Sequence, residues 1–422
     1  MNGQSYSSAC RMPGLLPIYS FFRLFFSVDI TRILVIFAQF LCGIISVRCL
    51  ALIARQLFNS NIYSLVLIVY SLSSFVSIWD HYGLSDSFSV SFLIFSVYFL
   101  IKFIYSQVNL NLILSGLFIA WSVFFRPVVI IIMPLYLIVL YRGVSYKLLF
   151  QYVKQAVILC SILFLFLLVW VFYNYKRTQR FIPLQDTMEN CFSSYPLHFQ
   201  KITDLVIGWG GDYQKWHSGG EMHWFLNKNI DVKKSNPFSS NIYTSVYNYD
   251  SIVKLRQAYF LSVSQGIDSK LKKYYIDYVT ENATLYKSVY EKEHPLNFYI
   301  FNRLRLIVNF CFPLHLENLP FPKRTDMSFI QFCVKGFYFL LFLAISFFGV
   351  LSVFFVIKEN NRKIILVYGI PIMFIFILAG YLGYIESRYF VPVYPFFFLF
   401  YCFTLIKIFV KIKLLRNMLM IS

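Results

Sequence analysis

The sequence predicts an all-α polytopic membrane protein, a helical bundle of about nine spans with a mixed, mostly helical insert. Of its 422 residues, 59% are hydrophobic and 14% are charged. Soluble domains usually carry about a quarter charged residues. The apolar residues fall into runs, each near the length that crosses about 30 Å of hydrocarbon, though two runs are short. Basic residues gather at one side of these runs, as expected for a membrane protein.

The apolar runs divide the chain into three parts. We expect an N-terminal transmembrane module at 1–173, an insert at 174–328 and a C-terminal transmembrane module at 329–422. The insert holds 14 of the 19 acidic residues. The predicted spans lie at about 33–54, 62–79, 87–105, 112–125, 127–141, 156–173, 330–357, 364–383 and 390–410.

The distribution of basic residues predicts the orientation. One side of the spans carries a single acid, Glu359, and a set of basic residues, so the positive-inside rule makes it cytoplasmic. The insert then faces outward, which in a bacterium is the periplasmic side of the inner membrane. The net charge of +19 therefore indicates contact with anionic membrane lipids, with no nucleic-acid partner. The cytoplasmic basic residues are Arg48, Arg55, Lys102, Arg142, Lys147, Lys154, Lys358, Arg362, Lys363, Lys407, Lys411, Lys413 and Arg416.

Acidic and basic residues also gather at the outer membrane surface, against the usual bias. Carboxylates and guanidiniums together at that level suit a site for an anionic lipid substrate. The acidic members are Asp29, Asp80, Asp86 and Glu386, and the basic ones are Arg11, Arg23, Arg32, Arg126 and Arg388.

Asp80, His81 and Asp86 lie within seven residues of one another in a short loop, "WDHYGLSDSFSVS" at 79–91. Two interpretations stay open. The loop is a solvated connection whose Asp86 caps the next helix, or its carboxylates bind a divalent cation or orient an acceptor hydroxyl.

Arg126 and Pro127 interrupt an apolar stretch. Arg126 either extends to the water interface at a helix break or binds phosphate, whose oxygens match the planar guanidinium.

The insert contains an aromatic and glycine-rich segment, "GWGGDYQKWHSGGEMHW" at 208–224. Trp209 and Trp216 are candidates for stacking against a sugar. His217, Glu221 and His223 lack the helical spacing of a metalloprotease zinc site, so a metal is the weaker interpretation here. The chain carries no P-loop and no GxGxxG motif, so any activated donor is expected to come through the membrane.

Taken together, several segments resemble the polytopic GT-C glycosyltransferases, and most closely the protein-mannosyltransferase-like group that includes the lipid A aminoarabinose transferases. The segments that carry the resemblance are "RMPGLLPIY" (11–19), "ARQLFNSNIYSLVLIVYSLSS" (54–74), "FRPVVIIIMP" (125–134), "YNYKRTQRFIPLQD" (173–186) and "ESRYFVPVYP" (386–395).

The resemblance implies transfer of a sugar from a polyprenyl-phosphate donor to an acceptor hydroxyl on a glycan, lipid or protein, with inversion at the anomeric carbon. It implies an acidic base in the first outer loop, basic residues on the lipid phosphate and, in some members, a divalent cation. We therefore expect catalytic roles for Asp86, Asp80 and Glu386, with Asp80 and Asp86 holding the metal if one is used. The expected substrate-binding residues are Arg11, His81, Arg126, Arg180, Trp209, Trp216, Arg388 and Tyr389.

The stretch "GYIESRYFVPVYP" (383–395) fits this scheme. Arg388 would meet the donor phosphate, and Glu386 would orient Arg388 or a substrate hydroxyl. Pro392 and Pro395 would allow the chain to bend where it enters the last span.

The N-terminus departs from the family pattern. Family members have a helix, and commonly an acid, ahead of the Arg-x-Pro-Gly segment, whereas here Arg11 is preceded by ten residues without a carboxylate. We therefore expect either a truncated or an inactive transferase, with an open groove near Arg11, Asp86, Arg126 and Arg388.

Two other functions stay open. An O-antigen polymerase or ligase is also polytopic with a large outer loop, although the Glu-x-Arg-Tyr ending argues against it. A non-catalytic envelope-glycan assembly protein or flippase would need polar residues within the spans, whereas the charges here gather at one surface.

Overall fold

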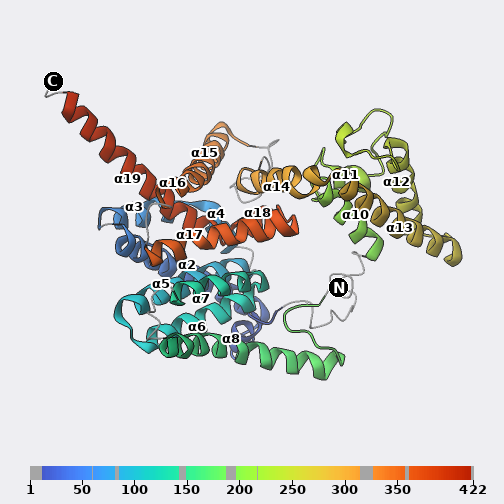
Figure 1. Cartoon of the computed structure of the whole chain (residues 1–422). Helices are drawn as coiled ribbons and strands as arrows, with labels where there is room; N and C mark the ends of the chain where they lie inside the picture. Colours follow the sequence, from blue (N-terminus) through green and yellow to red (C-terminus); the bar gives the residue numbers. More distant parts are fainter. Residues whose placement is uncertain are drawn as a thin grey trace. The chain divides into compact units, whose positions relative to one another are not determined.

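The computed structural model describes residues 12–58, 60–80, 85–141, 149–186, 196–215, 217–313, 327–356 and 361–419. These residues form helices joined by loops, and they contain no β-strand (Figure 1). The predicted all-α polytopic class is confirmed. The chain divides into two compact units. The membrane unit comprises the described residues of Arg11–Gln185, Leu316–Phe374 and Ser387–Ser422, and the insert unit those of Asp186–His315 and Ile375–Glu386.

The membrane unit contains most of the apolar helices. Its elements are α1 (Leu16–Arg23), α2 (Val28–Leu57), α3 (Ser60–Ser71), α4 (Ser74–Ser77), η2 (Ile78–Asp80), α5 (Ser85–Ser106), α6 (Asn109–Phe125), η3 (Pro127–Ile132), α7 (Met133–Tyr141), α8 (Leu149–Thr178), α15 (Phe329–Leu351), α16 (Val353–Val356), α17 (Arg362–Phe374), α18 (Ser387–Phe390) and α19 (Tyr394–Leu419).

Five helices are long and apolar enough to cross a membrane: α2, α5, α8, α15 and the continuous helix Arg362–Leu382. The other four predicted spans fall on shorter apolar helices, Ile62–Ser71, Asn109–Phe125, Pro127–Tyr141 and Tyr394–Phe409. The exact number of crossings therefore stays a prediction. Exposed apolar side chains such as Ile33, Phe37 and Ile44 on α2 are those expected of helices that face lipid.

The predicted second span, 62–79, is broken in the structure. Helix α3 ends at Ser71, and α4 and η2 continue separately to Asp80. The hydroxyl of Ser73, in the break, lies 2.6 Å from that of Tyr394. The break brings Phe75 against the Tyr394 ring, with 4.6 Å between the stacked ring centroids. Ser73, in the break between α3 and α4, thus anchors the start of α19.

The insert unit is built on α10 (Leu197–Gly208), α11 (Glu221–Leu226), η5 (Ser240–Ile242), α12 (Tyr249–Val263), α13 (Ser269–Glu293), η6 (Asn297–Phe301) and α14 (Asn302–Cys311). Helices α10 and α12 pack against α13 around a core rich in aromatic residues. Asn248 and Asp268 cap the first turns of α12 and α13, where their side chains accept otherwise unsatisfied backbone N–H groups.

The insert unit also includes a segment that the sequence places in the C-terminal module. Element η7 (Ile375–Leu382) continues α17 and packs against α14. It ends at Gly383, whose φ of +75° is in the left-handed region. A Cβ at this position would also collide with the side chain of Ile207 on α10, so glycine is required twice over.

Candidate functional site

Two pairs of serines set the register between α5 and α6. The hydroxyls of Ser96 and Ser115 each donate to the other's backbone carbonyl at 2.9 Å. Ser89 and Ser122 make the same exchange at 3.2 and 2.8 Å. Small hydroxyl residues let two membrane helices approach closely and bond directly. The second pair lies one helical turn from Asp86 on α5 and one turn from Arg126 after α6, so this register brings the two charged residues together.

Asp86 and Arg126 form an ion pair inside the membrane unit. Asp86 lies in the first turn of α5, where a carboxylate is favoured by the helix dipole. It is 5% exposed, and the Arg126 side chain is 15% exposed. An unpaired charge at this depth is costly, so each residue stabilises the other. Asp86 is the second residue of α5, so it lies inside the first turn and not at the predicted cap position, and its role is that of a specific charge partner.

Arg126 lies directly after the end of α6, in extended backbone. Helix α6 ends at Phe125, and Arg126 is extended, with φ −142° and ψ 103°. Pro127 disfavours helical backbone at the preceding residue, so the break follows from the sequence. The N–H of Gly14 donates to the Phe124 carbonyl at 3.0 Å. Gly14 is part of the "RMPG" segment, and Phe124 directly precedes the "FRPVVIIIMP" segment, so the two family-like segments lie next to each other here.

Tyr389 links Arg126 to Arg388. The guanidinium carbons of Arg126 and Arg388 lie over its ring, at 5.7 and 5.2 Å from the ring centroid. Arg388 and Tyr389 belong to the short helix α18, which Phe390 holds in place. The buried Phe390 ring packs against Phe342, with centroids 5.4 Å apart. The structure thereby joins residues 86, 126, 388 and 389 into one cluster, and the sequence had marked each of them.

Glu386 lies in the insert unit, unlike Arg388. It accepts a hydrogen bond from the Tyr213 hydroxyl at 3.3 Å. The rings of Tyr213 and Tyr384 are also neighbours, with centroids 6.0 Å apart. Sequence reasoning missed Tyr213 as a partner of Glu386, because no local pattern joins residues 173 positions apart.

Trp209 does not have the open ring face expected for sugar stacking. It is 3% exposed and packs against Phe238 and Tyr247 in the core. Its indole N–H donates to the Tyr247 hydroxyl at 2.9 Å. The sequence prediction overlooked this because a tryptophan in a glycine-rich loop gives no sign of its burial. Trp209 contributes to the wall of a pocket, described next.

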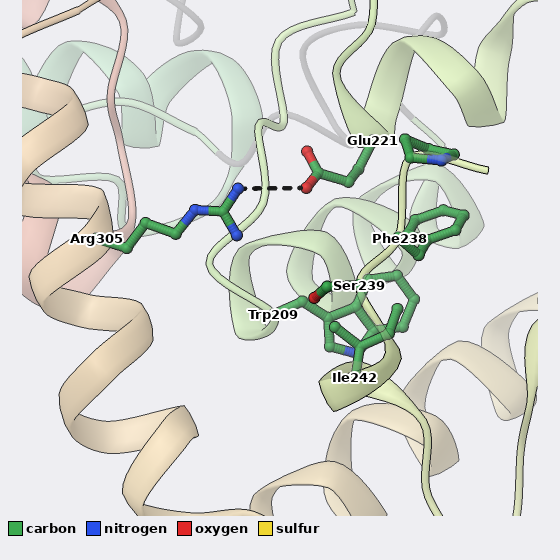
Figure 2. Close-up of a pocket in the computed structure, with 7 residues that line it drawn as sticks. Trp209, Glu221, Phe238, Ser239, Ile242 and Arg305 are labelled. Carbon is green, nitrogen blue, oxygen red and sulfur yellow. Dashed lines mark ion pairs between the residues drawn. The ribbon is translucent and has the colours of Figure 1, made fainter. Parts of the chain in front are cut away.

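A small pocket, open to solvent, lies in the insert unit, with a cavity volume of about 60 Å³. This is well below the volume of drug-sized ligand pockets, which run from about 300 to 1,000 Å³. Figure 2 shows the Glu221 carboxylate facing the Arg305 guanidinium, at 3.8 Å. Glu221 also accepts the N–H of Asp212 at 2.8 Å. The remaining lining residues are Trp209, Pro237, Phe238, Ser239 and Ile242.

The other predicted site residues are placed as follows. Arg180 is exposed, just beyond the end of α8. Arg11, His81 and Trp216 lie outside the described residues, and Asp80 is described only by its backbone at the end of η2. The groove expected near Arg11 therefore stays a prediction.

Of the two residues expected to hold a divalent cation, Asp86 does not fit that role, and the side chain of Asp80 lies outside the part that the structure describes. The Asp86 carboxylate is already in contact with the Arg126 guanidinium. No group of three or more His, Cys, Asp or Glu side chains capable of holding a metal occurs among the described residues. We therefore derive no step through a metal.

The comparison with protein families finds a relationship for the N-terminal part of the chain. Residues 16–172 match the family model described as dolichyl-phosphate-mannose-protein mannosyltransferase. This part of the chain is similar to the GT-C-type mannosyltransferases. The comparisons with curated proteins and with solved structures gave no match.

The match to this mannosyltransferase family confirms the resemblance found in the sequence and supports a membrane glycosyltransferase of the GT-C type. It covers α1 to most of α8, with Asp86 and Arg126. Two of the family-like segments lie beyond it, at 173–186 and 386–395. The structure itself brings Arg388 and Tyr389 to the part that the family covers, through their contacts with Arg126.

Proposed function

We propose that this protein transfers a sugar from a polyprenyl-phosphate carrier to an acceptor hydroxyl on the periplasmic side of a bacterial inner membrane. The observation that carries the proposal is the cluster of Arg126 and Arg388 over the Tyr389 ring, at 5.7 and 5.2 Å. Arginine matches phosphate oxygens through two parallel N–H donors. The family match over residues 16–172 supports a lipid-linked sugar as the donor.

In this mechanism the acceptor oxygen forms a bond to the anomeric carbon while the bond from that carbon to the phosphate oxygen breaks. The configuration inverts, and the lipid phosphate leaves with the bonding electron pair. Arg126 and Arg388 stabilise the charge that develops on the leaving phosphate, where fixed donors are most effective. Asp86 holds Arg126 in place through their ion pair.

A general base must take the proton of the acceptor hydroxyl. Asp86 is poorly suited because its carboxylate is bound to Arg126. Two other residues of this chain are candidates for the general base. They are Glu386, which accepts a hydrogen bond from Tyr213, and Asp80. Glu386→Gln should lower the transfer rate strongly if Glu386 is the base, since general-base catalysis typically contributes about 10²–10⁴-fold.

We further propose that the pocket at Glu221 and Arg305 receives a sugar of the acceptor. Paired carboxylate and guanidinium groups offer hydroxyls both an acceptor and donors. The rest of the lining includes Ser239 and the buried rings of Trp209 and Phe238, so the ion pair carries the recognition of the sugar hydroxyls. Arg305→Ala should raise KM for the acceptor and leave KM for the donor unchanged.

The test of the donor proposal is transfer of a labelled sugar from polyprenyl phosphate by the full chain in proteoliposomes. Arg388→Ala should abolish transfer, and Arg126→Ala should do the same if the protein still folds. Arg32→Ala is a matched control, because Arg32 is an exposed guanidinium paired with Asp29 at 3.7 Å. Equal transfer by Arg388→Ala and wild type would refute the phosphate role.

The orientation is tested separately with reporter fusions after residues 190 and 416. An enzyme active only outside the cytoplasm should be active at position 190 and silent at position 416. The reverse pattern would overturn the proposed topology and, with it, the periplasmic site.

A further inference from the structure

The last helical segment of the insert, η6 and α14, has an apolar outer face. Leu296, just before η6, and three residues at successive intervals of four are each between 47% and 63% exposed. The members of this stripe are Leu296, Ile300, Leu304 and Val308, and exposed Tyr299 and Phe301 lie beside it. Surface helices of soluble domains carry polar residues on their outer face. This face therefore requires an apolar covering.

The opposite face of the same segment is already used. Phe298, Leu306 and Phe310 are buried in the insert unit. Asn302 donates to the Gly208 carbonyl at 2.9 Å and to the Tyr290 hydroxyl at 3.1 Å. The helix thus cannot rotate to hide the stripe, because doing so would strip Asn302 and the core residues of their partners.

The neighbour of α14 is the end of an apolar helix. Helix α14 packs against η7, the last part of the candidate membrane span Arg362–Leu382. Arg303 donates to the Tyr381 carbonyl at 3.3 Å, and Ile307 lies against Gly380. Tyr381 is itself 78% exposed, as suits an aromatic residue in the interfacial belt. The apolar surface of the span end therefore continues onto α14.

The charges of the segment agree with a lipid surface. Residues 294–313 contain no acid, and they carry Arg303 and Arg305, of which Arg305 is paired with Glu221 at 3.8 Å. The preceding helix α13, by contrast, has acids and lysines along its length, as is typical of a helix in water. An amphipathic helix with basic residues binds in the interface of an anionic bilayer, with its apolar face about 5–10 Å deep at the boundary between headgroups and acyl chains.

We propose that η6 and α14 form an interfacial helix that seats the insert on an anionic lipid bilayer, with the stripe from Leu296 to Val308 among the upper acyl chains. This membrane contact is independent of the proposed transferase activity. It requires no substrate, and it would hold for an inactive protein.

The experiment places an environment-sensitive fluorescent amino acid at position 304 by suppression of an amber codon, in the full chain in lipid nanodiscs. Position 285 is the matched control, because Leu285 is a similarly exposed leucine on α13 of the same unit. Spin-labelled lipid reports contact with acyl chains, and acrylamide, which is uncharged, reports contact with water. We expect blue-shifted emission at 304, several-fold stronger quenching by the lipid than at 285, and several-fold weaker quenching by acrylamide.

Position 300 serves as a second site in case the substitution at 304 disturbs folding, and it should behave as 304 does. Quenching by acrylamide at 300 and 304 equal to that at 285 would overturn the proposal. Protection from both quenchers would also overturn it, because a second copy or another protein would then cover the stripe. Anionic lipid should increase the blue shift over neutral lipid, and an equal shift in both would refute the role of the headgroup charge.

Discussion

Arg126 forms an ion pair with Asp86, which lies 40 residues earlier in the chain. Arg126 is the residue between the end of α6 and the start of η3 at Pro127. The pair depends on the hydrogen-bonded serines that align α5 with α6. The ion pair both stabilises the membrane unit and positions Arg126, a proposed phosphate ligand. Mutations can separate its effect on stability from its effect on activity.

Asp86→Asn should destabilise the protein by about 3–5 kcal/mol, because it leaves the mostly buried Arg126 charge without its counter-charge. The double variant Asp86→Asn with Arg126→Gln removes both charges and should recover most of that loss. The midpoint of thermal unfolding in detergent measures both. Activity should not return in the double variant, since Arg126 is gone. A single variant as stable as the wild type would show that the pair is unimportant.

Arg388→Lys retains the charge but loses the planar pair of donors. A lost charge-assisted contact costs about 1.5–3 kcal/mol, so KM for the lipid-linked donor should rise about tenfold to a hundredfold. Arg32→Lys, at the exposed control position, should leave KM unchanged. An unaltered KM in Arg388→Lys would mean that Arg388 does not bind the donor in this bidentate manner.

Tyr389→Phe and Tyr389→Leu separate the ring from the hydroxyl. Phenylalanine retains the aromatic face beneath the guanidiniums of Arg126 and Arg388, whereas leucine removes it. Each cation–π contact contributes about 0.5–2 kcal/mol. Donor affinity should therefore be close to normal in the phenylalanine variant and several-fold weaker in the leucine variant. Equal loss in both would assign the role to the hydroxyl.

Gly14→Ala tests the contact between the "RMPG" segment and Phe124. The new Cβ would lie 2.5 Å from the Phe124 carbonyl oxygen, which belongs to the backbone and cannot simply turn aside. Forced overpacking typically costs about 1–3 kcal/mol, so the unfolding temperature should fall. Gly336→Ala on α15 is the control, because a Cβ there meets nothing within 4 Å. The interpretation fails if both substitutions have the same effect.

His198 should make the insert unit less stable at acidic pH. Burial, and to a lesser extent the positive charge of Lys272, lower the pKa of His198 below its usual 6.5. The unfolded chain then takes up a proton more readily than the folded one, so stability is complete above pH 6.5 and is lost as the pH falls from there toward the folded pKa. The expected result is a fall in the urea midpoint, followed by tryptophan fluorescence, between pH 7.5 and pH 5.5.

His198→Phe is the control for this pH effect. It retains an aromatic ring near Tyr259, whose centroid is 5.8 Å from that of His198, but it cannot be protonated. The variant should lose less stability than the wild type over the same pH range. An identical loss in both proteins would place the pH dependence elsewhere.

The sequence by itself determined the all-α membrane class and the identity of the charged residues at the site. Both are local properties. The length of an apolar run determines whether it can span a bilayer, and a charged residue next to such a run can be read directly from the sequence. The break at Arg126 was equally readable, because Pro127 disfavours helix at the residue before it.

Only the tertiary structure decided which of these residues meet. The pairing of Asp86 with Arg126, the contact of Gly14 with Phe124 and the position of Tyr389 under two guanidiniums all depend on helix register. Register is set by contacts between segments far apart in the chain, such as the serine pairs of α5 and α6. The burial of Trp209 and the packing of η7 against α14 could not be predicted from the sequence for the same reason. Neither a tryptophan nor an apolar run specifies which distant segment it packs against.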